Sequence, residues 1–171
     1  MSPMRLFNLS LALALAAALL TAQPPAGKGK GKAPQPAKEF TSAAEIQAMI
    51  AKAKNDRKDG QAIVNANILR LAPYAANLEY RASVGPASVH ETEAEMFYVI
   101  EGSATMVTGG KLVGETRTNA ENLSGTAIEG GNSRTVSKGD FIMVPEKTAH
   151  WFSKIDGTIV LMSMHLPHSG N

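Results

Sequence analysis

The sequence contains no cysteine. Disulfide bonds, thiolate metal sites and cysteine nucleophiles are therefore excluded. The chain has 171 residues, 44% of them hydrophobic, which predicts a single globular domain. A domain of about 130 residues buries enough surface to be stable without covalent cross-links.

Acidic residues are absent from the beginning of the chain. All of them lie from Glu39 onward, whereas five basic residues precede that position, namely Arg5, Lys28, Lys30, Lys32 and Lys38. The formal net charge of +2 therefore comes from the N-terminal part, and the rest of the chain is net acidic. This distribution gives no support to a nucleic-acid partner.

Residues 1–22 are typical of a signal peptide, because Arg5 precedes a Leu/Ala run over residues 6–20. That run is shorter than the about 20 residues of a membrane-spanning helix, although an uncleaved anchor is the alternative. Residues 23–38 are rich in proline, glycine and lysine, which predicts a disordered linker rather than a basic tether. We therefore expect a periplasmic or secreted protein that has no membrane contact once the signal is removed.

Residues 39–171 are predicted to form the folded domain. Ser42 and Glu45 match a capping box, and Ile46, Met49 and Ile50 follow at helical spacing, which predicts a short N-terminal helix. Short β patterns then follow at residues 63–71, 77–82, 87–90, 95–101, 104–108, 111–115, 133–137, 140–144, 149–153 and 158–166. This spacing predicts an all-β barrel or sandwich. The polar stretch 116–132 is either a functional loop or a tolerated insertion.

Two segments of the chain carry chemistry. His90 ends one predicted strand and Glu95 begins the next, where Glu95 shares a face with Phe97 and Val99. A carboxylate that faces an apolar interior needs a cation or hydrogen-bond donors. In the second segment Gly139 and Pro145 bracket a strand and His150 opens the next. Two imidazoles and one carboxylate can thus converge from three strands.

These residues resemble the two motifs of the cupin superfamily. Glu95 and Gly102 match the first motif with its six-residue spacing, and His90 matches its second histidine. The second motif is matched at Gly139, Pro145 and His150. The resemblance covers residues 74–166 and implies a double-stranded β-helix, or jelly-roll, barrel. It departs from the pattern at Ser88, where the first histidine should stand, and at Lys147 and Lys154, which replace a glycine and an asparagine.

His90, Glu95 and His150 are the predicted metal ligands, and the expected cofactor is a divalent transition metal, Fe, Mn, Ni or Zn. Glu93 has the same strand parity as Glu95 and is a reserve fourth ligand. Because Ser88 removes one usual ligand, the alternative is that the two histidines are ordinary polar residues at a barrel mouth.

Other polar and aromatic residues are interpreted without a role in chemistry. Asn77, Glu79 and Arg81 are interpreted as an edge or solvent-facing charged strand, and Tyr98 is expected to face away from the site. His165 and His168 are interpreted as structural or solvated. Four side chains are interpreted as core or pocket lining, namely Phe97, Phe141, Met143 and Phe152.

Cupins include enzymes of several classes, storage proteins and sensing domains, so the resemblance does not decide the activity. The first hypothesis is an exported metal-site protein or enzyme acting on a small polar molecule, such as a sugar, a sugar acid or an aromatic acid. The second is a ligand-binding module without a metal or catalytic activity. For a sugar acid, Arg81 or Lys147 could supply the positive charge. Whether the protein forms a homodimer is left open.

Overall fold

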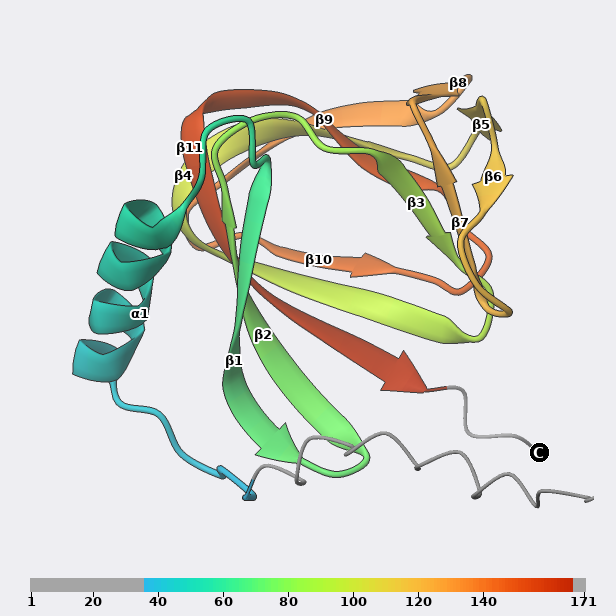
Figure 1. Ribbon diagram of the computed structural model, residues 1–171. Helices are drawn as coiled ribbons and strands as arrows, with labels where there is room; N and C mark the ends of the chain where they lie inside the picture. Colours follow the sequence, from blue (N-terminus) through green and yellow to red (C-terminus); the bar gives the residue numbers. More distant parts are fainter. Residues whose placement is uncertain (1–35, 168–171) are drawn as a thin grey trace, which may run out of the picture. The chain divides into compact units, whose positions relative to one another are not determined.

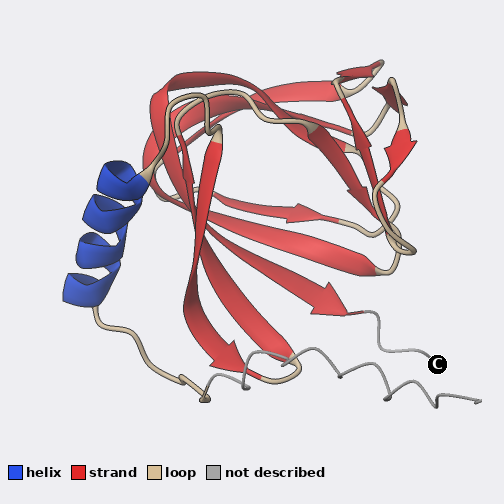
Figure 2. Cartoon of the chain, viewed as in Figure 1, coloured by secondary structure: helices blue, strands red, loops and turns tan. Residues whose placement is uncertain are grey.

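The computed structural model describes residues 36–167, so the predicted signal peptide and nearly all of the predicted linker lie outside the described residues. Figure 1 shows one helix beside a curled assembly of strands, and Figure 2 shows how completely strands dominate the fold. The elements are α1 (Ala43–Asp56), β1 (Ile63–Leu71), β2 (Tyr74–Arg81), β3 (Ala87–His90), β4 (Glu93–Thr108), β5 (Lys111–Val113), β6 (Thr116–Arg117), β7 (Asn122–Gly125), β8 (Ala127–Glu129), β9 (Asn132–Ser137), β10 (Phe141–Val144) and β11 (His150–Pro167).

Nine of the strands form one sheet. It runs β1-β2-β11-β3-β7-β6, and β4 pairs with β11, β9 and β10, while β5 and β8 form a separate small sheet. The pairing is antiparallel wherever strands meet. The all-β jelly-roll barrel predicted from the sequence is confirmed.

Strands β4 and β11 form the spine of the barrel. Their ladder runs from His150 opposite Thr108 to Pro167 opposite Glu93 and includes His165 opposite Glu95, with register shifts at three places along β11. Such irregularities bend strands and allow a long ladder to close on itself. Gly102 lies at one of these bends with φ of 82°, and a Cβ there would be 2.0 Å from the carbonyl oxygen of Thr158.

The barrel interior is apolar on the side formed by β4, β9, β10 and β11. Alternate residues of these strands point inward, as the two-residue period of a strand requires. The buried cluster comprises Phe97, Val99, Ala104, Met106, Val136, Ile142, Val144, Phe152, Ile159 and Leu161. Phe141 and Met143, expected to be core or pocket lining, are instead 71% and 54% exposed, because Ile142 and Val144 take the inward positions of β10.

Helix α1 covers part of the outer face of the barrel. Its capping box is formed in both directions: the Ser42 hydroxyl accepts from the Glu45 backbone N–H, and the Glu45 carboxylate accepts from the Ser42 backbone N–H. Ile50 and Ala53 pack against Leu78 of β2, together with other apolar residues of that face. Within residues 36–167, no helix has the length and apolar character needed to cross a membrane.

The stretch 116–132, predicted to be a long loop, contains the short strands β6, β7 and β8. Of these, β7 pairs with β3 along its whole length, from Ala87 opposite Gly125 to His90 opposite Asn122. Strands β6 and β7 are therefore part of the barrel wall next to His90, whereas β8 belongs to the small sheet that it forms with β5.

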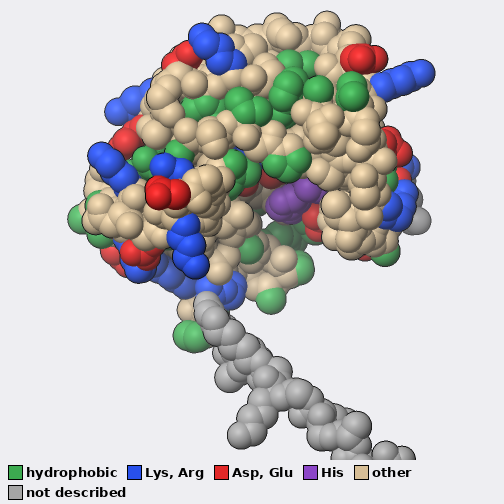
Figure 3. All heavy atoms as spheres, turned by 45° about the horizontal axis from the view of Figure 1, so that its top comes forward, with side chains coloured by type: hydrophobic (Ala, Val, Ile, Leu, Met, Phe, Trp, Pro, Cys, Tyr) green, Lys and Arg blue, Asp and Glu red, His purple; other side chains and the backbone are tan. Residues whose placement is uncertain are grey.

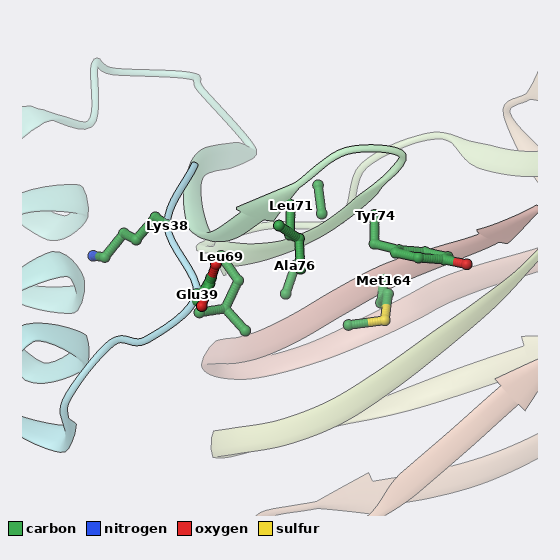
Figure 4. A pocket seen from close by; sticks show the side chains of 8 residues that line it. Lys38, Glu39, Leu69, Leu71, Tyr74, Ala76 and Met164 are labelled. Carbon is green, nitrogen blue, oxygen red and sulfur yellow. The ribbon is translucent and has the colours of Figure 1, made fainter. Parts of the chain in front are cut away.

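An apolar hollow of about 230 Å³ lies where residues 38 and 39 meet the β1–β2 hairpin. Figure 4 shows Leu69, Leu71, Tyr74 and Met164 around it. Met164 and His165 point to opposite faces of β11, because side chains alternate along a strand. The hollow contains no histidine and no buried charge.

Candidate metal centre

Four titratable residues are brought together at one end of the barrel. His90 ends β3, Glu95 lies early in β4, and His150 and His165 lie near opposite ends of β11. The backbone N–H of Lys147 donates to the carbonyl of His90 over 2.7 Å, which holds the two motif segments against each other. Lys147 has φ of 58°, the left-handed conformation that favours the glycine it replaces.

Glu95 is the centre of the group. Its Oε2 lies 3.2 Å from Nε2 of His90 and 3.0 Å from Nε2 of His150. The Glu95 side chain is only 5% exposed. The three residues predicted from the sequence therefore do meet, and they share one carboxylate oxygen.

His165 joins the same group, which the sequence interpretation did not expect. Its Nε2 lies 3.5 Å from Oε1 of Glu95, and its ring makes an edge contact with His90 at 4.6 Å between centroids. The ligand atoms of His90, Glu95 and His165 all lie within 4.8 Å of one another, a spacing that suits one metal ion. His150 is not one of these three residues, and its polar contact with the group is the one between its Nε2 and Oε2 of Glu95.

The far nitrogens of two rings are held by neutral acceptors. His90 Nδ1 donates to Oδ1 of Asn122 over 2.6 Å, and His150 Nδ1 donates to the carbonyl of Thr148 over 3.3 Å. A ring whose Nδ1 carries the proton presents the Nε2 lone pair to a metal, which is the usual arrangement of ligating histidines. Asn122 and Thr148, which are not part of the cluster, therefore orient both rings so that each Nε2 can bind a metal.

Nδ1 of His165 lies 3.1 Å from Oε2 of Glu93. The two atoms are too poorly aligned for a hydrogen bond, and this nitrogen is the one buried side-chain N or O atom within residues 36–167 that has no hydrogen-bond partner. Glu93 therefore approaches the cluster, as its strand parity predicted. It contacts His165 and not the imidazoles of the predicted triad.

The electrostatics of the group favour an ionised Glu95. Burial acts to raise the pKa of Glu95, but hydrogen bonds from His150 and His90 outweigh it and lower the pKa to about 2. Burial likewise acts to lower the pKa of His90, yet its hydrogen bonds to Glu95 and Asn122 raise the pKa above its ordinary value of 6.5. Without a metal, these residues form a buried ion-paired network.

The cluster is reachable from solvent. Figure 3 shows histidine side chains in a hollow of the surface, with acidic side chains beside them. His165 and Glu93 are 34% and 36% exposed, whereas His150 is only 6% exposed. His165 and Glu93 therefore form the solvent side of the site, and His150 forms its inner side.

The interpretation of Glu79 and Arg81 as an edge or solvent-facing pair is wrong. Strand β2 lies between β1 and β11, and the two side chains are 11% and 12% exposed. Arg81 Nη2 contacts Glu79 Oε2 at 2.6 Å, and the guanidinium lies over the Phe152 ring at 4.7 Å. The charge of Arg81 is therefore already compensated inside the barrel.

Ser88, which stands where the cupin motif has its first histidine, lies opposite His150 in the β3–β11 pair. A small pocket of about 60 Å³ separates this region from β2, and it is lined by both Ser88 and Arg81. The third imidazole near Glu95 thus comes from β11 instead of from β3.

A signal for His165 is present in the sequence. Ile159, Leu161, Ser163 and His165 alternate along β11, and the first three are at most 1% exposed. The two-residue period that placed Glu95 inside therefore also places His165 inside. The position of His165 near the C-terminus, where chains are often frayed, argues against an inward-facing role and so masks this signal.

The comparison with protein families agrees with the fold. The profile described as Cupin matches residues 62–168, which is more than half of the chain, so the chain belongs to the cupin family. A search of curated proteins found no match.

Several solved structures are similar in fold at low sequence identity. Fe(II) HppE has 16% identity and a TM-score of 0.48, with 64% of this chain and 54% of that chain covered. The cupin domain of Cnp3 from Schizosaccharomyces pombe has 14% identity and a TM-score of 0.46, with 68% and 72% covered. KdgF from Halomonas sp. has 16% identity and a TM-score of 0.45, with 66% and 87% covered. This chain spans about half the length of HppE, and identities this low carry no information on substrate.

Proposed function

We propose that this cupin binds one divalent transition metal at the mouth of its barrel and that a small polar molecule meets the protein there. Glu95, His90, His150 and His165 would hold the ion. The observation that carries the proposal is the convergence of three of the chain's four histidines on one buried carboxylate.

The donor set fits a metal in two respects. The Nδ1 atoms of His90 and His150 already donate to neutral oxygens, so each Nε2 can offer its lone pair. The buried Nδ1 of His165 has no hydrogen-bond partner. A bound ligand or a change of protonation in the site would give this unsatisfied nitrogen a partner. Imidazole and carboxylate donors suit Fe(II), Mn, Ni or Zn, and the set does not choose among them.

A bound divalent ion would act as a Lewis acid or lower the pKa of a bound water. The protein's own residues would bind the ion and orient its ligands and the incoming molecule. Asn122 and Thr148 fix two imidazole rings, Glu95 neutralises charge in the interior, and Glu93 with His165 faces the incoming molecule. Turnover assays with small sugars, sugar acids and aromatic acids test whether the bound molecule reacts.

One observation favours a second candidate function, a ligand-binding module that holds no metal. Glu95 needs a cation or hydrogen-bond donors in the barrel, and the Nε2 atoms of His90 and His150 already contact its carboxylate. The cluster is therefore stable as an ion-paired network, and a polar ligand could bind to it directly.

We further propose that the protein acts in the periplasm or outside the cell, which rests on the signal-like sequence of residues 1–22. Intact mass and cell fractionation in the native host would test it. A full-length cytosolic protein would contradict the proposal.

Metal analysis of protein purified without chelators is the experiment that separates the two functions. We expect about one equivalent of metal, and a melting temperature that rises when Mn, Fe(II), Ni, Co or Zn is added to stripped protein, because a ligand of the native state stabilises it by mass action. His90→Ala and His165→Ala should lose both effects.

The matched control is Glu91→Gln, which removes a half-buried carboxylate near the site that pairs with Arg117. It should bind metal like the wild type. A wild type with no stoichiometric metal and no thermal response to any of the five ions would refute the metal proposal and leave the ligand-binding module in its place.

A further inference from the structure

The barrel has a second, polar wall that the metal cluster does not use. On β1, Asn65 and Asn67 lie directly opposite Glu79 and Asn77 of β2, so they share the inward face with them. Glu79 is buried, but Asn65 and Asn67 are exposed. Inward-facing side chains that remain exposed border an open space, so the barrel is open to solvent along this wall.

Arg70 stands on the same wall. A register shift between Asn67 and Leu69 places Arg70 opposite Ala75, which by alternation has the face of Asn77. The side chains agree with this placement, since Arg70 Nη2 donates to Oδ1 of Asn67 over 2.8 Å, and Asn67 Nδ2 donates to Oδ1 of Asn77 over 2.6 Å. Arg70 and the two asparagines therefore form one hydrogen-bonded row.

The charge of Arg70 is not compensated. Its other side-chain bond goes to the neutral carbonyl of Pro36, and no carboxylate of residues 36–167 makes an ion pair with it. Arg81 and Arg117, by contrast, pair with Glu79 and Glu91. Arg70 is thus an oriented guanidinium on the inner wall that has hydrogen-bonding capacity left for an anion.

The row leads toward the metal cluster. Asn77 lies opposite Ser163 of β11, and His165 is the next residue of β11 on that face. Arg70 is on β1, two strands away from β11, which corresponds to about 10 Å across the sheet. A molecule the size of a single sugar acid can bridge this span.

Resting on the proposed function, we infer that the site takes a small hydroxylated carboxylic acid. Its carboxylate binds Arg70, its hydroxyl groups hydrogen-bond to Asn67 and Asn77, and its far end meets the cluster at His165 and Glu95. Asparagine amides both donate and accept, as recognition of hydroxyl groups requires. Arg81 and Lys147, the basic residues suggested by the sequence, are not needed: Arg81 is paired with Glu79 inside the barrel.

The test compares sugar acids with neutral molecules of the same size. Gluconate, glucuronate and galacturonate are titrated calorimetrically into the full mature protein, with sorbitol and glucose as uncharged counterparts. At least one acid should bind about tenfold or more tightly than its neutral counterpart, a typical size for a hydrogen bond to a charged group. Added salt should lower the affinity for the acid and leave the affinity for the neutral counterpart unchanged.

Arg70→Gln should lose about tenfold in affinity for the acid, and Arg70→Lys should lose less because it keeps the charge. The matched control is Arg57→Gln, since Arg57 is the C-cap residue after α1 and also donates to a neutral carbonyl, that of Gln61. It should bind the acid like the wild type. The inference is overturned if none of the acids binds, if acids and neutral molecules bind alike, or if Arg70→Gln keeps the wild-type affinity.

Metal binding measured on the same samples distinguishes this inference from the proposed function. If the wild type holds no metal but binds an acid through Arg70, the metal proposal fails and the Arg70 site stands. If the wild type holds metal but acid binding does not depend on Arg70, only the inference about Arg70 fails. Where the wild type holds metal, Arg70→Gln should retain the wild-type metal affinity. In both cases an unchanged melting temperature of Arg70→Gln without added acid shows that the variant is folded.

Discussion

Replacing Glu95 with glutamine tests whether the ion-paired cluster stabilises the metal-free fold. Glu95 changes its pKa from 4.5 to about 2 on folding. A lowered carboxyl pKa contributes stability that is complete above the unfolded value and is lost as the pH falls through the folded value. A difference of this size corresponds to about 3 kcal/mol at pH 6 and to about half of that at pH 3.

The assay is urea unfolding of metal-stripped protein at both pH values. Glu95→Gln should lower the free energy of unfolding by about 3 kcal/mol at pH 6, or the melting temperature by about 10 °C, and by clearly less at pH 3. Glu93→Gln is the control, because Glu93 is 36% exposed and contacts only His165 in the cluster. A loss under about 1 kcal/mol at pH 6, or equal losses at both pH values, would refute the electrostatic account of the site.

Three further predictions concern the pH response, the barrel bend and the N-terminal boundary. The raised pKa of His90 contributes stability below pH 6.5 that is lost as the pH rises through the folded value, so metal-stripped protein should melt lower at pH 8.5 than at pH 6. Metal affinity should change in the opposite direction, because ligating histidines must be neutral; parallel trends in melting scans and metal titrations would contradict this. Gly102→Ala places a Cβ 2.0 Å from the Thr158 carbonyl and should cost several kcal/mol in urea unfolding, whereas Gly109→Ala, also at positive φ but with open space, should cost about 1 kcal/mol. Removing residues 1–35 should leave the melting temperature unchanged, but removal through Lys38 should lower it by a few degrees, since two backbone hydrogen bonds join Lys38 to Arg70. Equal melting temperatures for the two truncations would show that this bridge adds nothing.

Local sequence patterns were sufficient for the parts of the site that depend on one strand or one turn. The capping box of Ser42 and Glu45 formed as predicted, since it involves backbone groups only three residues apart. The alternation of Glu95 and Phe97 correctly placed the carboxylate inside the barrel, and the motif spacing brought His90 and His150 to it.

Strand order and register across the sheet were not available from local patterns. The alternation of Asn77, Glu79 and Arg81 predicts a solvent-facing strand, because nothing near these residues in the sequence shows that β2 lies between β1 and β11. The position of His165 near the C-terminus suggests a structural or solvated residue, although its partner in the ladder is Glu95 itself. The position of Arg70 depends on a register shift in β1 that no residue type marks.

One continuous strand, β11, carries both His150 and His165, and its irregular register between them bends it so that both rings reach Glu95. The cluster therefore forms only when β11 pairs with β4 in the correct register over the whole segment between the two histidines. A slip of one residue anywhere between the two histidines would turn one of them to the opposite face and break the set. Binding of a ligand that contacts both rings would in turn stabilise this register. The cluster thus holds the two ends of the longest strand together and keeps the barrel closed.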